Sequence, residues 1–165
     1  MKLNIGAGRK PLPSPWLNVD LEPQPKRGGQ WLKADAASIP LDSGCADEIQ
    51  AIHLFEHFYR WEVDALLAEW RRLLQPGGKL ALELPDISKA AQNLLNGDTE
   101  QMSMWAFYGD PTRRNPLMCH KWGWTPKTLR DCLERNCFEN IRFRPPLHHL
   151  KGRDRRDMRV ECFKP

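Results

Sequence analysis

The sequence predicts an α/β protein with a mostly parallel sheet of about seven strands that ends in an antiparallel strand pair. Segments with strand-like and helix-like periods alternate between residues 47 and 95, which is typical of parallel strands joined by right-handed crossovers. The last two strand-like segments, 139–144 and 157–163, have no helix between them, so we expect them to pair antiparallel. A length of 165 residues suits one domain, 1–165.

The first third of the chain contains four short strands and almost no helix. The segments 2–5, 16–21, 31–34 and 47–52 have the length and apolar content of buried strands. The connection RKPLPSP between the first two holds three prolines, and 22–30 is poor in helix formers, so neither has room for a normal crossover helix. We therefore expect a reduced set of helices on one face of the sheet.

Three later segments carry helix signals: 63–74, 87–95 and 126–135. The first has an apolar stripe at helical spacing and is followed by a Pro-Gly-Gly stop before a strand at 79–84. The second follows Asp86, a suitable N-cap, and the third has proline at its first position. These signals complete an alternating order of strands and helices.

Segment 98–124 has no regular period and is rich in aromatic residues. A connection of this length without regular structure is usually functional, so we predict a substrate lid or an interface segment. A parallel sheet is normally buried on both faces, so either this segment or a second subunit should cover the face that lacks helices. The chain has seven tryptophans, and aromatic residues are enriched in interfaces, which favours a homodimer.

Composition excludes several classes of protein. Hydrophobic residues make up 41% and charged residues 28%, which is typical of a globular domain. No apolar run is long enough to span a membrane, and the N-terminus has no signal-peptide pattern, so we expect a cytoplasmic protein without a membrane partner. The five cysteines form no C-x-x-C pair, which disfavours a disulfide framework or a zinc ribbon.

A glycine loop and an acid point to a nucleotide-type cofactor. Gly6 and Gly8 follow the first strand, and Asp20 ends the second, where an acid can bind ribose hydroxyls. A dinucleotide fold also needs a third glycine, a helix N-terminus for the pyrophosphate and an acid about 20 residues onward. Here Asp20 comes 12 residues after Gly8, and prolines replace the helix. The spacing favours a cofactor that has a ribose but no phosphate, such as S-adenosylmethionine.

The order of LNIGAG, NVDL, ADAASIPL, ADEIQAIHLFEHF, LLQPGGKLALELPD and the C-terminal strand pair resembles the class I (Rossmann-like) S-adenosylmethionine-dependent methyltransferases, in particular their small type-11-like members. The resemblance implies a Rossmann-like fold and S-adenosyl-L-methionine as cofactor. The chain departs from the family at Asn4, where an acid is frequent, and in lacking a third loop glycine. By match to the family, the cofactor-binding residues are Asn4, Gly6, Ala7, Gly8, Asp20, Leu21, Asp35, Ala36, His53, Leu54 and Phe55.

Four residues are candidates for catalysis: His57, His53, Glu56 and His120. Methyl transfer is an in-line displacement that depends mainly on positioning, and a base helps when the acceptor is a hydroxyl or a protonated amine. Residues 53–57 also match the H-x-x-E-H zinc pattern, but that pattern requires a helix and this segment directly follows a strand, so we expect no metal. His53 and His57 could instead only cap the strand and pack.

Several sequence features bear on the methyl acceptor. The segment IHLFEHF replaces the proline-rich motif of methyltransferases that act on base amines, and no Pro-Cys pair is present, so nucleic acid is a disfavoured substrate. We predict methylation of an oxygen or nitrogen on a small acceptor that is anionic or sugar-like. The alternatives are a non-catalytic S-adenosylmethionine-binding module and a nucleic-acid methyltransferase. The stretch 141–159 has a local net charge of +5, because it holds seven basic residues and two acids. An anion could bind the basic residues of this stretch, which are Arg142, Arg144, Lys151, Arg153, Arg155, Arg156 and Arg159.

Overall fold

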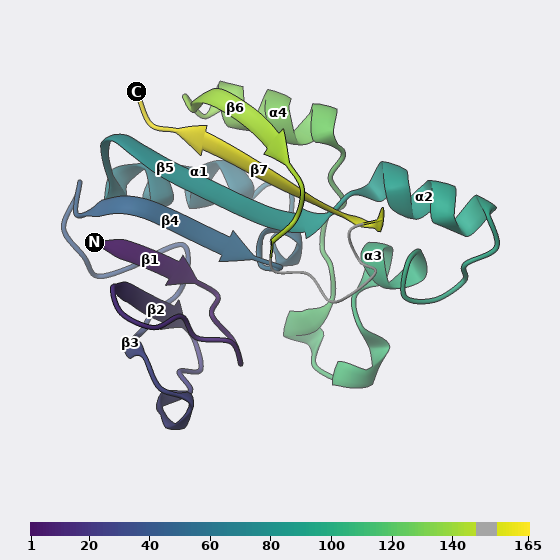
Figure 1. Cartoon of the computed structure of the whole chain (residues 1–165), viewed down its shortest axis with the longest axis horizontal. Coiled ribbons are helices and arrows are strands. Elements are labelled where there is room, and N and C mark those ends of the chain that lie inside the picture. The colour runs from purple at the N-terminus through teal and green to yellow at the C-terminus, as the bar shows by residue number, and fades with distance from the viewer. Residues whose placement is uncertain (148–154) are drawn as a thin grey trace.

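The computed structural model of the chain describes residues 1–147 and 155–165. Seven strands form one sheet in the order β3-β2-β1-β4-β5-β7-β6 (Figure 1). Strand β7 lies between β5 and β6 and runs antiparallel to both. The predicted fold class, including the antiparallel C-terminal pair, is confirmed. The strands are β1 (Lys2–Ile5), β2 (Trp16–Asp20), β3 (Gln30–Lys33), β4 (Ala46–Ile52), β5 (Leu74–Pro85), β6 (Glu139–Arg144) and β7 (Asp157–Phe163).

The three predicted helices are present as α1 (Val63–Leu73), α2 (Ile87–Leu95) and α4 (Pro126–Arg135). Asp86 caps α2 by accepting hydrogen bonds from two backbone amides of its first turn. Strand β5 begins at Leu74, earlier than the predicted start at residue 79, and it includes the Pro-Gly-Gly segment. A register shift between β4 and β5 accommodates these extra residues.

One face of the sheet is apolar and carries the hydrophobic core. The strand register places Leu17, Leu3, Ile49, Leu80 and Cys162 side by side on this face. The apolar stripes of α1 and α4 pack on it, behind the sheet in the view of Figure 1. The alternation of these positions along each strand sends the intervening residues to the other face.

The opposite face is polar and largely paired within itself. Glu48 accepts ion pairs from Lys2 and Lys79 at 2.9 and 2.7 Å. The next row carries buried amides that hydrogen-bond across three strands: Asn18, Asn4 and Gln50. The strand register also places Trp16 and Trp31 on this face, where both side chains are partly exposed. The homodimer stays a prediction.

Segment 98–124 lies beyond the C-terminal ends of β4 and β5, beside α2 (Figure 1). It contains α3 (Met104–Tyr108) and two short 3-10 helices, Pro111–Arg113 and Pro116–Met118. The backbone amide of Lys121 donates to the carbonyl of Glu56 at 2.8 Å, which holds the end of the segment against the turn after β4. Among the described residues, no helix is long and apolar enough to cross a membrane.

Candidate functional site

The glycine loop after β1 is held in place by the acid at the end of β2. Gly6 and Gly8 have φ values of +71° and +53°, which favour glycine. The Asp20 carboxylate accepts a hydrogen bond from the Gly8 amide at 2.8 Å and another from the Glu22 amide at 2.9 Å. A carboxylate offers about four lone-pair sites, so Asp20 can still accept hydrogen bonds from ligand hydroxyls. These contacts fit a ribose-containing cofactor.

The turn after β4 brings a second predicted residue against this loop. A Cβ atom placed on Gly6 would lie 2.8 Å from Cδ2 of Leu54, so the loop leaves just enough room for the leucine side chain. His53 has a φ of +51°, a strained value for a residue other than glycine, and it directs the chain into this turn. Gly6, Asp20 and Leu54 therefore meet at one edge of the sheet.

Two other predicted cofactor residues lie inside the fold. Asn4 is 4% exposed and belongs to the buried amide row. Phe55 is fully buried, and its ring packs against Trp70 and Trp124 with centroids 5.9 and 5.3 Å apart. The structure thus gives both residues a packing role.

The remaining predicted cofactor residues lie along the same edge. Asp35 and Leu21 are exposed, and Asp35 accepts a hydrogen bond from the Ala37 amide at 2.8 Å. Ala36 accepts a hydrogen bond from the indole of buried Trp70, which ties the Asp35–Ala36 turn to α1. The buried residue Ala7 lies within the glycine loop itself.

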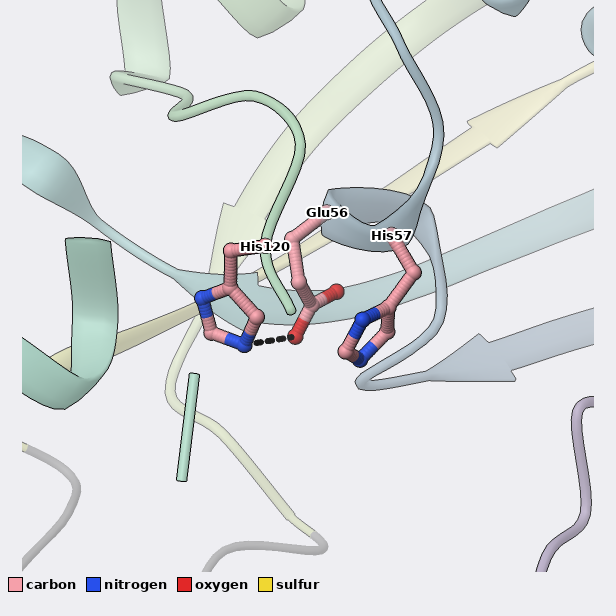
Figure 2. Close-up of side chains that lie close together, drawn as sticks. All are labelled: Glu56, His57 and His120. Atoms are coloured by element: carbon pink, nitrogen blue, oxygen red, sulfur yellow. Dashed lines mark ion pairs between the residues drawn. The ribbon is translucent and has the colours of Figure 1, made fainter. Parts of the chain in front are cut away.

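Glu56, His57 and His120 converge although His120 is more than 60 residues away in sequence (Figure 2). Glu56 and His57 lie in a 3-10 helix, Phe55–His57, directly after the turn at His53. His120 Nε2 lies 3.9 Å from Glu56 Oε1, and the two histidine rings are edge to face with centroids 5.0 Å apart. The four predicted catalytic candidates therefore form one group, in which His53 contacts Glu56 from the other side.

Backbone carbonyls orient both rings of the pair. Nδ1 of His57 lies 3.1 Å from the Cys119 carbonyl, and Nδ1 of His120 lies 2.8 Å from the Ala106 carbonyl. Because a carbonyl oxygen only accepts, each ring carries a hydrogen on Nδ1, and Nε2 is the acceptor in the neutral ring. Burial lowers the pKa of His120, which favours that neutral form.

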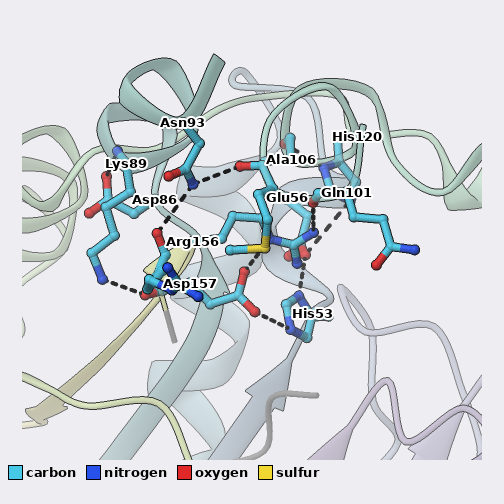
Figure 3. A network of polar contacts seen from close by, with 12 residues as sticks. His53, Glu56, Asp86, Lys89, Asn93, Gln101, Ala106, His120, Arg156 and Asp157 are labelled. Carbon is cyan, nitrogen blue, oxygen red and sulfur yellow. Dashed lines mark hydrogen bonds and ion pairs between the residues drawn. The ribbon is translucent and has the colours of Figure 1, made fainter. Parts of the chain in front are cut away.

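His53 bridges two buried carboxylates (Figure 3). Its Nδ1 donates to Glu56 Oε1 at 3.1 Å, and its Nε2 lies 3.3 Å from Asp157 Oδ2 as an ion pair without hydrogen-bond alignment. Burial alone would lower the pKa of His53, but the two carboxylates outweigh it and raise the pKa to about 9. Burial alone would raise the pKa of Glu56, but His53 lowers it to about 2. At neutral pH His53 is therefore a cation that positions an ionised Glu56.

Arg156 and Asp157 belong to this network, whereas the sequence predicted Arg156 only as an anion-binding residue and gave Asp157 no role in the site. Arg156 donates to Asp157 Oδ1 at 2.6 Å and to the Gln101 carbonyl at 3.0 Å, which ties β7 to segment 98–124 (Figure 3). Both side chains are almost completely buried. The alternation of arginine with acids in DRRDMRVE is the signal that could have indicated internal ion pairs.

The proposed basic surface is smaller than the sequence suggested. Arg156 is 3% exposed and Arg159 is 4% exposed, and Arg159 pairs with Glu83 and Glu161 inside the sheet. Counting these two arginines as anion-binding residues was therefore wrong, because their charges are already neutralised by buried partners. Of the seven basic residues, Arg142, Arg144 and Arg155 are exposed, and Lys151 and Arg153 lie outside the described residues.

Comparisons with known proteins agree with this geometry. A family model described as "Methyltransferase domain" matches residues 15–82. The fold resembles an S-adenosylmethionine-dependent methyltransferase from Archaeoglobus fulgidus, with a TM-score of 0.68, 16% identity, and coverage of 99% of this chain and 85% of that chain. A possible histamine N-methyltransferase from Thermotoga maritima gives a TM-score of 0.67, 17% identity, and coverage of 99% and 81%.

A third structure, phosphoethanolamine N-methyltransferase 2 of Haemonchus contortus in complex with S-adenosyl-L-methionine, gives a TM-score of 0.63 at 11% identity. The match covers 99% of this chain and 48% of that chain. At these identities the likeness shows the fold. No curated protein matches the chain in sequence.

Proposed function

We propose that the chain is a class I S-adenosylmethionine-dependent methyltransferase that methylates an oxygen or nitrogen of a small acceptor bound beside Glu56, His57 and His120. One observation carries the proposal: Leu54 touches the glycine loop, and this cluster begins two residues further along the chain. The loop and the cluster therefore flank the same edge of the sheet, where a donor and an acceptor could meet.

Residues of the β1, β2 and β4 edge would hold the donor. We assign the glycine loop to the methionine portion, Asp20 to the ribose hydroxyls and the Asp35–Ala36 turn to the adenine. When bound, the donor supplies a methyl group activated on a sulfonium sulfur. Asp20 is already fixed by the Gly8 and Glu22 amides, so little ordering of this side chain is needed on binding.

The histidines of the cluster can take a proton from the substrate. An acceptor hydroxyl or amine that must lose its hydrogen can pass it to Nε2 of His120 or His57, because both Nδ1 positions are occupied by carbonyls. His53 does not fill this role, since its raised pKa of about 9 keeps it protonated at neutral pH. Its part is to hold the carboxylate of Glu56 in place.

One exposed arginine supports an anionic acceptor. Arg144 is exposed and lines a cavity of about 340 Å³ together with Pro145, Leu147, Arg159 and Glu161. An anionic or sugar-phosphate acceptor would use Arg144, so the Arg144→Ala variant should raise KM for such an acceptor and leave kcat nearly unchanged. An unchanged KM would favour a neutral acceptor.

The test of the function separates donor binding from transfer. S-adenosylmethionine or S-adenosylhomocysteine at about 100 times its Kd should raise the stability by about 2.7 kcal/mol in a thermal-shift assay. The His57→Ala variant should keep this shift and lose methyl transfer to a panel of small hydroxyl and amine acceptors with labelled donor. The absence of any shift at millimolar donor would contradict the proposal. Light scattering at micromolar concentration tests the predicted homodimer.

A further inference from the structure

Three hydrogen-bond acceptors meet in the cluster without a donor among them. The Nδ1 hydrogens of His57 and His120 are used on backbone carbonyls, so in the neutral rings lone pairs remain on Nε2. Glu56 contributes a carboxylate, which only accepts. One potential ligand atom from each of the three residues lies within 4.8 Å of the other two. A cation placed between the three residues would bind all three acceptors at once.

The carboxylate of Glu56 supports the same conclusion independently. The residue is 2% exposed, and its Oε1 accepts the hydrogen bond from His53. Its Oε2 is buried and has no hydrogen-bond partner among the residues that the structure describes. A buried carboxylate oxygen without a partner is costly, and a bound cation would remove that cost. Figure 2 shows this carboxylate between the two histidine rings.

We propose that Glu56, His57 and His120 bind one divalent transition-metal ion, with Zn²⁺ as the best match. Two imidazoles and one carboxylate form a donor set that Zn²⁺ accepts while keeping a fourth position open. Ligands at about 2.0–2.2 Å from a tetrahedral ion lie roughly 3.5 Å from one another, so the three groups need only a small inward movement.

The surroundings of the cluster match those of a metal site. Metal-bound histidines usually donate their second ring N–H to a carbonyl or carboxylate, as His57 and His120 do with Cys119 and Ala106. The sequence pattern H-x-x-E-H had pointed to His53 and His57 on a helix, and that pairing was excluded. In the structure His120 takes the place of His53, so the requirement for a helix no longer applies.

Metal binding goes beyond the proposed function and does not depend on it. The role of the ion in the reaction does rest on that function: its open position would take an acceptor oxygen and make the hydroxyl more acidic. With the ion bound, His57 and His120 are ligands and no longer bases. The two arrangements therefore differ in whether transfer survives a chelator.

The experiment titrates Zn²⁺ into chelator-treated protein by calorimetry, without any methyl donor. We expect one ion per chain, and a loss of affinity of about 100-fold or more in His57→Ala and in His120→Ala. His57 is partly exposed, so this variant should keep its fold, which circular dichroism checks. Mg²⁺, which prefers oxygen ligands, should bind much more weakly. The matched controls, His148→Ala with His149→Ala, and Cys119→Ser, should bind Zn²⁺ as the wild type does.

Two outcomes would overturn the proposal: no binding of Zn²⁺ by the wild-type chain, or binding that persists in His57→Ala and His120→Ala. Binding that disappears in the His148/His149 or the Cys119 control would place the ion elsewhere and overturn it as well. A chain that binds the methyl donor but not Zn²⁺ refutes this inference alone. A chain that binds Zn²⁺ but not the donor refutes only the proposed function.

Discussion

The carboxylate of Asp20 closes the glycine loop by accepting a hydrogen bond from the backbone amide of Gly8 at 2.8 Å. The same carboxylate accepts from Glu22, so one side chain fixes both the loop after β1 and the end of β2. A ligand that binds at this edge meets an acid whose position is already set by the backbone.

Replacing Asp20 with alanine should weaken S-adenosylhomocysteine binding by about tenfold or more, because hydrogen bonds to a charged group contribute roughly 1.5–3 kcal/mol. Calorimetric titration measures the change. Asp47→Ala, which removes an exposed acid that pairs with the N-terminus, is the control and should bind as the wild type does. Equal affinity in the Asp20 variant and the control would contradict the assignment.

The contact between Gly6 and Leu54 predicts a coupled effect. Gly6→Ala should destabilise the chain by about 1–2 kcal/mol, because the new Cβ meets Leu54 at 2.8 Å and the φ of +71° disfavours alanine. In the Gly6→Ala, Leu54→Ala double variant, the loss of stability caused by the steric clash should disappear, and the loss caused by the unfavourable backbone φ should remain. Urea unfolding of all four proteins gives the coupling energy, and strict additivity would show that the two residues do not meet.

His53 compensates the charges of Glu56 and Asp157, both of which are buried. The His53→Ala variant should lose about 3 kcal/mol of stability, because it leaves the buried carboxylate of Glu56 without its hydrogen-bonded counter-ion, while Arg156 still pairs with Asp157. His57→Ala is the comparison, since that side chain makes one hydrogen bond to a carbonyl at an exposed position, and it should lose about 1 kcal/mol or less. Denaturant unfolding measures both. Similar losses in the two variants would mean that the contacts of His53 with Glu56 and Asp157 contribute little to stability.

The ion pairs of Glu48 predict a dependence of stability on acid. Burial alone would raise the pKa of Glu48, but hydrogen bonds and charges from Lys79 and Lys2 outweigh it and lower the pKa below 4.5. A lowered pKa in the folded state contributes stability above the unfolded-state pKa and loses it as the pH falls through the folded-state pKa. Wild type should therefore be more stable than Glu48→Gln at pH 7, by about 1 kcal/mol.

This difference should shrink once the pH drops below 4.5, and guanidinium unfolding across pH 7 to 3 would measure it. Asp47→Asn serves as the control, because its side chain is 55% exposed and pairs only with the N-terminus in the part of the chain described. A difference that stays constant with pH would contradict the role assigned to Lys2 and Lys79.

The local sequence pattern was sufficient to predict most helices and strands of the fold. The apolar stripe of α1 and the caps of α2 and α4 depend on neighbours within one or two turns, so the sequence predicts their positions to within a residue. The start of β5 was missed because proline and glycine usually end regular structure, whereas here a register shift with β4 absorbs them. The polar face was also readable in principle, since KLNI, LNVD and DEIQAI alternate polar and apolar residues.

The candidate site also combines residues that the sequence predicted with residues that it did not. The residue types near the ends of β1, β2 and β4 were predictable because parallel strands bring their carboxyl ends to one edge. Asp157, which pairs with His53, and Arg156, which pairs with Asp157, were not predictable, because both come from the far end of the chain and look from sequence like part of a solvated basic loop.

The sequence by itself determined the α/β class, the order of most elements and the glycine loop after the first strand, because hydrophobic period, caps and glycine spacing act over a few residues. Only the tertiary structure decided how the polar groups on one face of the sheet pair with one another, and that His120 joins Glu56 and His57. Those features depend on strand register and on where a long irregular segment returns to the sheet. Both are set by packing between residues that are distant in the chain.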